Sequence, residues 1–198
     1  MIIRKEDIMK YNSLQNIKLI NSICGVRGVH LIASKSKNYT SNLAIFSSIT
    51  HLGSNPPLLL FVSRPSNVVK RDTISNITET GYYTINSIEK DIINEAHQTS
   101  GKYPKSTSEF KECNLEEEYI EDFSIPFVSK SNIKIGMRFI DSVEIKQNQT
   151  ILVIGEIMLI KTRYKKLEHN FKNSASIIGL NSYYQNKHLK DLEYVRVK

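Results

Sequence analysis

The amino-acid sequence predicts a mainly β protein, a barrel with short peripheral helices, and three observations lead to that fold class. Short apolar stretches recur along the chain, and residues that favour turns separate them. Helical periodicity is confined to a few segments, so strands and helices do not alternate as they do in a doubly wound parallel sheet. The chain has 198 residues, 40% hydrophobic and 24% charged, which is enough for a core and argues against disorder.

The sequence shows no internal boundary that would divide it into separate domains. It contains no repeat, no low-complexity segment and no linker-like stretch. We therefore expect residues 1–198 to form a single domain. Its core is expected at about residues 20–185, with an N-terminal arm or helix at 1–19 and a C-terminal tail at 186–198.

The first two predicted strands cover residues 26–33 and about 42–50. In the second strand the period of two places Leu43 and Ile45 on one face and Phe46 on the other. A turn-forming run of serine, lysine and asparagine separates the two strands. This arrangement is typical of neighbouring antiparallel strands.

The remaining elements follow from prolines, glycines and periodicity. The two adjacent prolines of the Asn55–Pro56–Pro57 segment interrupt regular structure because they remove two backbone donors. Gly81 is a natural stop for the helix before it. The elements expected after residue 57 are strands at 58–63 and 82–88, helices at 67–80 and 89–100, a polar loop at 101–118, strands at 127–130, 133–145 and 151–160, and a tail from 173 onward.

The composition excludes several classes of protein. The net charge of +7 and the pI near 9.3 suit anionic partners, but the lysines are scattered and the densest basic segment, 161–166, is typical of a solvated loop or strand end, which disfavours a nucleic-acid partner. No run approaches the roughly 18 apolar residues of a membrane span, and the N-terminus does not resemble a signal peptide. We therefore expect a cytoplasmic protein without a membrane partner.

Familiar catalytic motifs are absent from the sequence. It has no phosphate loop, no dinucleotide-binding glycine motif and no nucleophile elbow. The two cysteines, Cys24 and Cys113, are too few for a disulfide framework and are expected to be reduced thiols, and no cluster suits a metal ion. His51 and His97 are isolated histidines, for which a structural role is the commoner one. We predict no catalytic side chain and no metal site.

Two polar clusters remain as candidate binding sites. The first is the strand segment 41–50, in which small hydroxyl residues would let a flat ring lie close to the backbone and would bond its polar edge. An edge strand with a solvated face is the alternative interpretation. The second comprises Ser63–Arg64 and residues 70–73, where basic side chains and helix-end donors would hold a phosphate. An ordinary basic helix surface is the alternative there.

These clusters belong to an ordered set of four blocks. They are NLAIFSSI (42–49) with NPPL (55–58), KRDT (70–73) with NI (76–77) and TGYYTIN (80–86), YP (103–104) with SEF (108–110), and IGEI (154–157) with GLNSYY (179–184). The set resembles the flavin reductase-like family of FMN-binding split barrels, which includes the flavoredoxins. The resemblance covers roughly residues 20–185. It implies a six-stranded antiparallel split barrel of Greek-key character, and a homodimer with FMN near the subunit interface.

The resemblance also assigns cofactor-binding residues by position. One set would line the ribityl chain and the isoalloxazine edge, and a second would meet the phosphate. Two further residues are weaker candidates, and one of them, Asn86, is also interpretable as a structural cap. The sets are Asn42, Ala44, Ser47, Ser48 and Thr50 for the first, Arg64, Lys70 and Thr73 for the second, and Asn86 and Ser100 as the further candidates.

The function implied is an FMN-binding oxidoreductase that transfers electrons from NADH, NADPH or a redox partner to an acceptor. In such a protein the flavin does the redox work, and the polypeptide sets its position and hydrogen bonding. Two alternatives stay open: a non-enzymatic flavoprotein electron carrier, and a barrel module that binds a nucleotide or nucleic acid. FMN is preferred to FAD because the residues at 70–73 suit a terminal monophosphate.

The strand at 151–160 bears on the oligomeric state. Both of its alternating faces are largely apolar, and one of them can fill a barrel while the other needs cover. A helix of the same chain would supply that cover in one interpretation. The resemblance favours a two-fold partner, and we therefore expect a homodimer.

Overall fold

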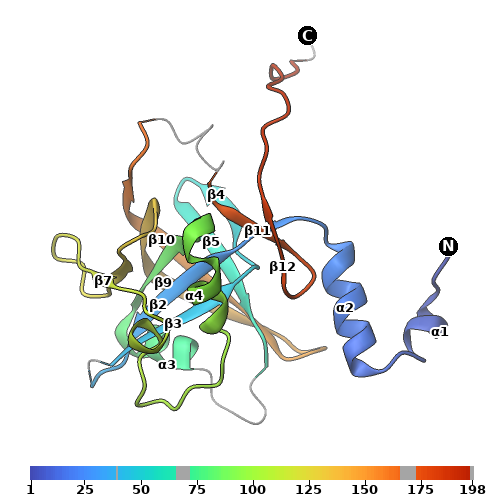
Figure 1. The fold of residues 1–198 in the computed structure, drawn as a ribbon, viewed down its shortest axis with the longest axis horizontal. Coiled ribbons are helices and arrows are strands. Elements are labelled where there is room, and N and C mark those ends of the chain that lie inside the picture. Colours follow the sequence, from blue (N-terminus) through green and yellow to red (C-terminus); the bar gives the residue numbers. More distant parts are fainter. Residues whose placement is uncertain (39, 66–71, 166–172, 197–198) are drawn as a thin grey trace.

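The computed structural model of the chain describes residues 1–38, 40–65, 72–165 and 173–196. Its main feature is a seven-stranded sheet in the order β3-β2-β6-β9-β10-β5-β4, in which every neighbouring pair is antiparallel. The sheet curls around an apolar interior (Figure 1). Its strands are β2 (His30–Lys35), β3 (Ser41–Phe46), β4 (Thr50–Ser54), β5 (Pro57–Ser63), β6 (Tyr82–Ser87), β9 (Ile133–Ile145) and β10 (Thr150–Thr162).

The sheet has one strand more than the six that the resemblance implies. The segment predicted as one strand at 42–50 is two, because β3 ends at Phe46 and β4 begins at Thr50. Between them the chain leaves β2 and crosses toward β5, which is the strand that pairs with β4. The predicted alternation within β3 is confirmed: Leu43 and Ile45 pack in one apolar cluster and Phe46 in the other.

Side chains from six strands, β2, β3, β5, β6, β9 and β10, fill the interior of the barrel. The helix α3 (Asp72–Thr80), which follows β5 in the chain, adds to them. Aromatic rings of Phe46, Phe61 and Tyr83 meet edge to face, with centroids 5.0 Å and 5.7 Å apart. Such pairs contribute about 0.5–1.5 kcal/mol beyond the area that they bury. The fully or nearly fully buried members are Ile32, Phe61, Ile77, Tyr83, Ile85, Met137 and Val153.

Gly155 in β10 makes room for one of these rings. A Cβ atom at this position would lie 2.2 Å from the Tyr83 hydroxyl oxygen, which is closer than real contacts allow. The IGEI block therefore carries its glycine for packing inside the barrel. The same strand pairs with β9 through register shifts at Ile154/Gly155 and Ile157/Leu159, and such bulges bend the long hairpin.

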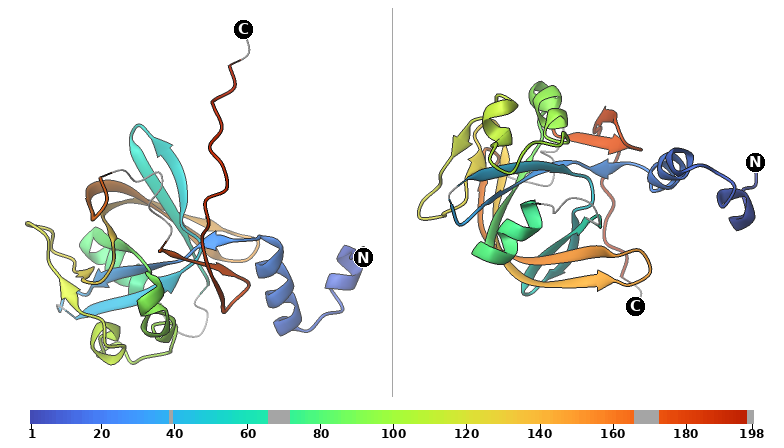
Figure 2. Two further views of the ribbon diagram at one scale, coloured as in Figure 1. Left: turned by 45° about the horizontal axis from the view of Figure 1, so that its top comes forward. Right: turned by 90° about the horizontal axis from the view of Figure 1, so that it is seen from below.

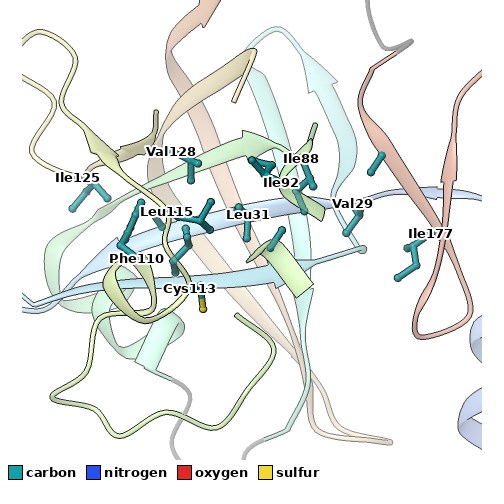
Figure 3. Close-up of a cluster of buried hydrophobic side chains, with 14 residues drawn as sticks. Val29, Leu31, Ile88, Ile92, Phe110, Cys113, Leu115, Ile125, Val128 and Ile177 are labelled. Carbon is teal, nitrogen blue, oxygen red and sulfur yellow. The ribbon is translucent and has the colours of Figure 1, made fainter. Parts of the chain in front are cut away.

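A second apolar cluster lies on the opposite face of β2 and β3, as Figure 3 shows. Short elements pack over this cluster: the helices η1 (Lys90–Ile92), α4 (Ile93–Gln98) and α5 (Glu109–Glu112), and the hairpin of β7 (Glu117–Glu118) and β8 (Phe127–Val128). Leu31 of β2, Phe110 of α5 and Val128 of β8 are central members. The barrel wall is thus packed on both sides.

The remaining elements lie at the periphery. The segment β1 (Arg27–Gly28) pairs with β11 (Ala175–Ile178), which pairs with β12 (Ser182–Gln185). The helices α1 (Lys5–Ile8) and α2 (Ser13–Ile23) project from the sheet, and the chain after β12 extends away from it (Figures 1 and 2). The helix expected at 89–100 is shorter, the region from residue 173 holds two strands that the sequence did not predict, and the long hairpin at 133–160 is confirmed. No helix among the described residues is long and apolar enough to cross a membrane.

Candidate flavin site

The predicted site residues of the first cluster lie along one rim of the barrel. The rim runs from β3 through residues 47–49 to β4, and the end of β5 and the start of α3 lie beside it. Asn42 ties β3 to α3, because its side-chain Nδ2 donates a 3.0 Å hydrogen bond to the Thr73 Oγ1. Both side chains are buried, at 9% and 5% exposure. A pair predicted to bind opposite ends of a cofactor is thus joined directly.

Ser48 ties the rim to β5. Its hydroxyl accepts from the Val62 N–H and donates to the Val62 carbonyl oxygen, both at 3.1 Å. The pairing of β4 with β5 covers only Pro57 to Leu60 of β5. The N–H and the carbonyl group of Val62 therefore lie beyond the last β4–β5 pair. Ser48 therefore takes the place of a strand residue and closes the gap between β3 and β5 with a side chain.

β3 is an edge strand, since β2 is its only partner among the described strands. Every second N–H and C=O of such a strand points away from the sheet. Glu109 of α5 accepts the Leu43 N–H on that edge at 2.9 Å. Glu109 is only 9% exposed, and its burial raises the pKa of the carboxyl group above the ordinary value. Sequence reasoning quoted Glu109 in the SEF block without giving it a role.

The other residues of the first cluster line the same rim with small side chains. Ala44 lies on the Asn42 face of β3, and Ala44 and Ser47 are half-buried. Thr50 opens β4 and is exposed. Small side chains beside open backbone are what a flat aromatic ring needs for a close approach.

The residues predicted to meet a phosphate lie where β5 ends and α3 begins. Arg64 directly follows β5 and is exposed. Thr73 is the second residue of α3, and the N-terminus of a helix favours an anion through its unpaired N–H groups. Lys70 lies outside the described residues. The structure thus brings Arg64 and Thr73 to the rim that Asn42 and Ser48 define.

Asn86 and Ser100 lie elsewhere. The Asn86 amide is fully buried, donates to Leu31 and Thr84, and accepts the Val128 N–H at 3.0 Å, so it holds β6 against β2 and β8. Ser100 is exposed beyond α4, and its hydroxyl donates to the His97 carbonyl oxygen at 2.7 Å. We leave both out of the site proposed below, and Asn86 fits its alternative interpretation as a structural residue.

The rim fits a flavin in the chemistry of its groups. A flavin has a flat ring with a polar edge, a chain of hydroxyls and a phosphate at its end. The edge backbone of β3 and the small side chains beside it suit the ring. The hydroxyl and amide groups of the rim suit the chain, and Arg64 at the end of β5 suits the phosphate.

The other titratable groups near this region carry no acid–base function that the structure reveals. His51 bonds Ser54 at 3.0 Å, and His97 bonds the Tyr183 hydroxyl at 2.8 Å. In the part of the chain that the structure describes, no group of three His, Cys, Asp or Glu residues is placed to hold a metal ion.

A curled antiparallel barrel with such a rim defines a class of protein, the flavin-dependent oxidoreductases with a split barrel. Comparison with known proteins agrees. The model of the flavin reductase like domain matches residues 25–193. The chain belongs to the flavin reductase-like family.

Solved structures support the same assignment. The chain is similar to a candidate flavin reductase with a split barrel domain from Shewanella frigidimarina, with 35% identity, coverage of 98% and 100% of the two chains, and a TM-score of 0.93. It shares its fold with the nitrilotriacetate monooxygenase component B from Bacillus cereus, at 19% identity, 97% and 98% coverage, and a TM-score of 0.84. It shares the fold also with a flavoredoxin of Desulfovibrio vulgaris, at 18% identity, 86% and 92% coverage, and a TM-score of 0.72.

Proposed function

We propose that the chain binds FMN along the rim and passes electrons through it from NADH or NADPH to an acceptor. The observation that carries the proposal is the joining of the rim by Asn42–Thr73 and Ser48–Val62, which brings β3, the end of β5 and the start of α3 together. When bound, the flavin supplies the redox chemistry, because it exchanges a hydride or single electrons with its partners.

The residues of the chain position the cofactor and hold its phosphate. The edge of β3 and the side chains of Ser47 and Thr50 face the ring and the ribityl chain in this proposal. Arg64 and the start of α3 neutralise the phosphate, with Lys70 as a further cation of the same segment. These groups suit a terminal monophosphate, which is the reason for proposing FMN rather than FAD.

The proposal includes a homodimer with the rim near the seam between subunits. Its support is the exposed apolar surface of the described chain. Met158 and Ile160 of β10 are 52% and 49% exposed, and Ile140 of β9 is 45% exposed. Large apolar patches on one chain mark an interaction surface. A second copy would cover them, and the place of the rim near the seam rests on the resemblance to the family.

An anaerobic titration tests the function. The full chain, loaded with FMN, is titrated with NADH and NADPH while flavin absorbance is followed. Bleaching by a reduced nicotinamide supports the oxidoreductase. Flavin that binds but is bleached only by dithionite supports the electron carrier instead. A chain that takes up no flavin overturns the proposal and leaves the nucleotide-binding module.

A further inference from the structure

A pocket of about 210 Å³ lies at the far end of the long hairpin, away from the rim. The β7–β8 hairpin forms one wall, and the start of β9 and the end of β10 form the others. Four of its lining residues are charged: Glu118, Lys134, Lys161 and Arg163. The other lining residues, Ser129, Ser131, Asn132 and Thr162, carry hydroxyls or an amide.

The charge in the pocket is positive. Glu118 is shared by two lysines: the Lys134 Nζ lies 2.8 Å from one carboxylate oxygen, and the Lys161 Nζ bonds the other. Arg163 adds a third cation, so three positive groups face one carboxylate. Glu89 lies behind the wall and accepts the Asn132 N–H at 3.3 Å, but it does not line the pocket. A cleft with one dominant sign concentrates ions of the other.

Donors in the pocket remain for a ligand. The Lys134 side chain is 5% exposed, and its ammonium group is bonded to the Ser129 carbonyl oxygen and to Glu118. An ammonium group has three donors, so one is left. Within the described part of the chain, no residue bonds the Arg163 guanidinium, whose backbone N–H alone is bonded, to Asn132. A buried lysine and an unpaired arginine thus point to an anion.

We propose that this pocket binds a phosphate group, either inorganic phosphate or the phosphate of a nucleotide. Two positive charges in excess match a phosphate dianion. The volume equals that of about seven water molecules at ~30 Å³ each, which exceeds what a phosphate alone needs. The hydroxyls of Ser129 and Thr162 suit its remaining oxygens.

This site is separate from the flavin rim and goes beyond the proposed function. The register of β10 shows the separation, because Ile151 pairs with Ser63 beside Arg64, whereas Lys161 pairs with Lys134 ten residues further along the strand. The phosphate of the flavin and the phosphate in this pocket therefore bind to different cations.

Phosphorus NMR of the full chain tests the proposal. Inorganic phosphate and AMP are each titrated at an ionic strength held constant with chloride. Adenosine, which contains no phosphorus, is added to the AMP sample as the uncharged competitor. Lys161→Ala with Arg163→Ala is the test variant, and both side chains are exposed enough for the fold to tolerate their loss. Lys146→Ala, in the exposed turn at the other end of the hairpin, is the matched control.

Phosphate binding should be weakened by about tenfold or more in the double variant and unchanged in the control, because the double variant loses two charge-assisted contacts. Inorganic phosphate binding as tightly as AMP identifies the free ion. AMP binding more tightly, with adenosine not competing, identifies a nucleotide. Binding no stronger than that of chloride, or binding that survives in the double variant, overturns the proposal.

Discussion

Tyr83 is a side chain whose hydroxyl costs the fold stability. It is fully buried, its oxygen has no hydrogen-bond partner among the described residues, and burial raises its pKa far above the ordinary value. A buried polar group without a partner costs about 1–3 kcal/mol. Tyr83→Phe should therefore raise the free energy of unfolding in urea by about 1 kcal/mol. A loss of stability instead would show that the hydroxyl has a partner.

A second substitution, at Gly155, tests the same packing of the Tyr83 ring. Gly155→Ala places a methyl group against the Tyr83 oxygen and should cost about 1–3 kcal/mol, as overpacked cores do. In the Tyr83→Phe background the clash with the oxygen is gone, although the ring carbon Cζ still lies 2.9 Å from the new Cβ. The cost should therefore be smaller there but not zero. Equal costs in both backgrounds would contradict the packing argument.

Glu109 should make stability depend on pH. Its folded pKa lies above the ordinary value of 4.5, so its contribution to stability is present below the unfolded pKa and is lost as the pH rises through the folded one. Glu109→Gln keeps an oxygen for the Leu43 N–H but carries no charge. Relative to the wild type, this variant should gain stability from about pH 4.5 upward, measured by urea unfolding. Glu112→Gln, on the exposed side of α5, should show no such gain.

Arg64 and Lys70 should together hold the flavin phosphate. Replacing both by Ala should weaken FMN binding by about 3–6 kcal/mol if each charge-assisted contact is worth about 1.5–3 kcal/mol. Calorimetry with FMN and with riboflavin separates the phosphate from the ring, and riboflavin affinity should not change. Lys90→Ala, an exposed lysine of η1, is the control. Unchanged FMN affinity would show that the two cations face elsewhere.

At the scale of elements, Ser48 is the side chain that joins the two halves of the barrel wall. Ser48→Ala leaves the Val62 N–H and carbonyl oxygen without their partner and should cost about 1–3 kcal/mol of unfolding free energy. Ser47→Ala removes a neighbouring hydroxyl that bonds no described residue and should stay within about 0.5 kcal/mol. If Ser48→Ala costs no more than Ser47→Ala, the closure does not depend on this hydroxyl.

The elements could be predicted from the sequence where their periodicity or punctuation was strong. The hairpin at 133–160 has long apolar alternation, and Gly81, with its φ of +77°, ends α3 where the sequence placed the stop. The break between β3 and β4 was missed because it depends on a bond from Ser48 to a distant strand. The strands β11 and β12 were missed because each has only four residues, and only the pairing of β11 with β1 and with β12 defines them.

The candidate site could be predicted in part, because some of its residues belong to sequence motifs. The positions of Asn42, Ser48, Arg64 and Thr73 could be anticipated from ordered motifs, but their mutual bonds depend on tertiary contacts. Glu109 was missed because its partner, the Leu43 N–H, is a backbone group that no sequence pattern reveals. The phosphate pocket joins residues from 118 to 163, whose proximity follows from the β7–β8 and β9–β10 pairings and from the ion pairs of Glu118 with Lys134 and Lys161.

At the scale of the whole molecule, the projecting N-terminal helix favours the dimer. The helix α2 buries no residue, and Leu14, Ile17 and Ile20 are 40–56% exposed along one side of it. Together with the exposed face of β10, these side chains need cover. Sedimentation at micromolar concentration should report about twice the mass of the 22.7 kDa chain, with more than about 2,000 Å² buried in total. A monomer that keeps FMN bound would contradict the shared seam.

The carboxyl group of Glu109 has a consequence outside the chemistry of the site. An unclosed sheet ends in two strands, and a bare edge strand is a template on which another molecule can add its own strand. The edge of β4 is short and irregular, with a register shift between His51 and Gly53. On β3 a strand arriving at Leu43 would have to displace a buried acidic side chain from the backbone N–H. The β3 edge is thereby a poor seed for aggregation.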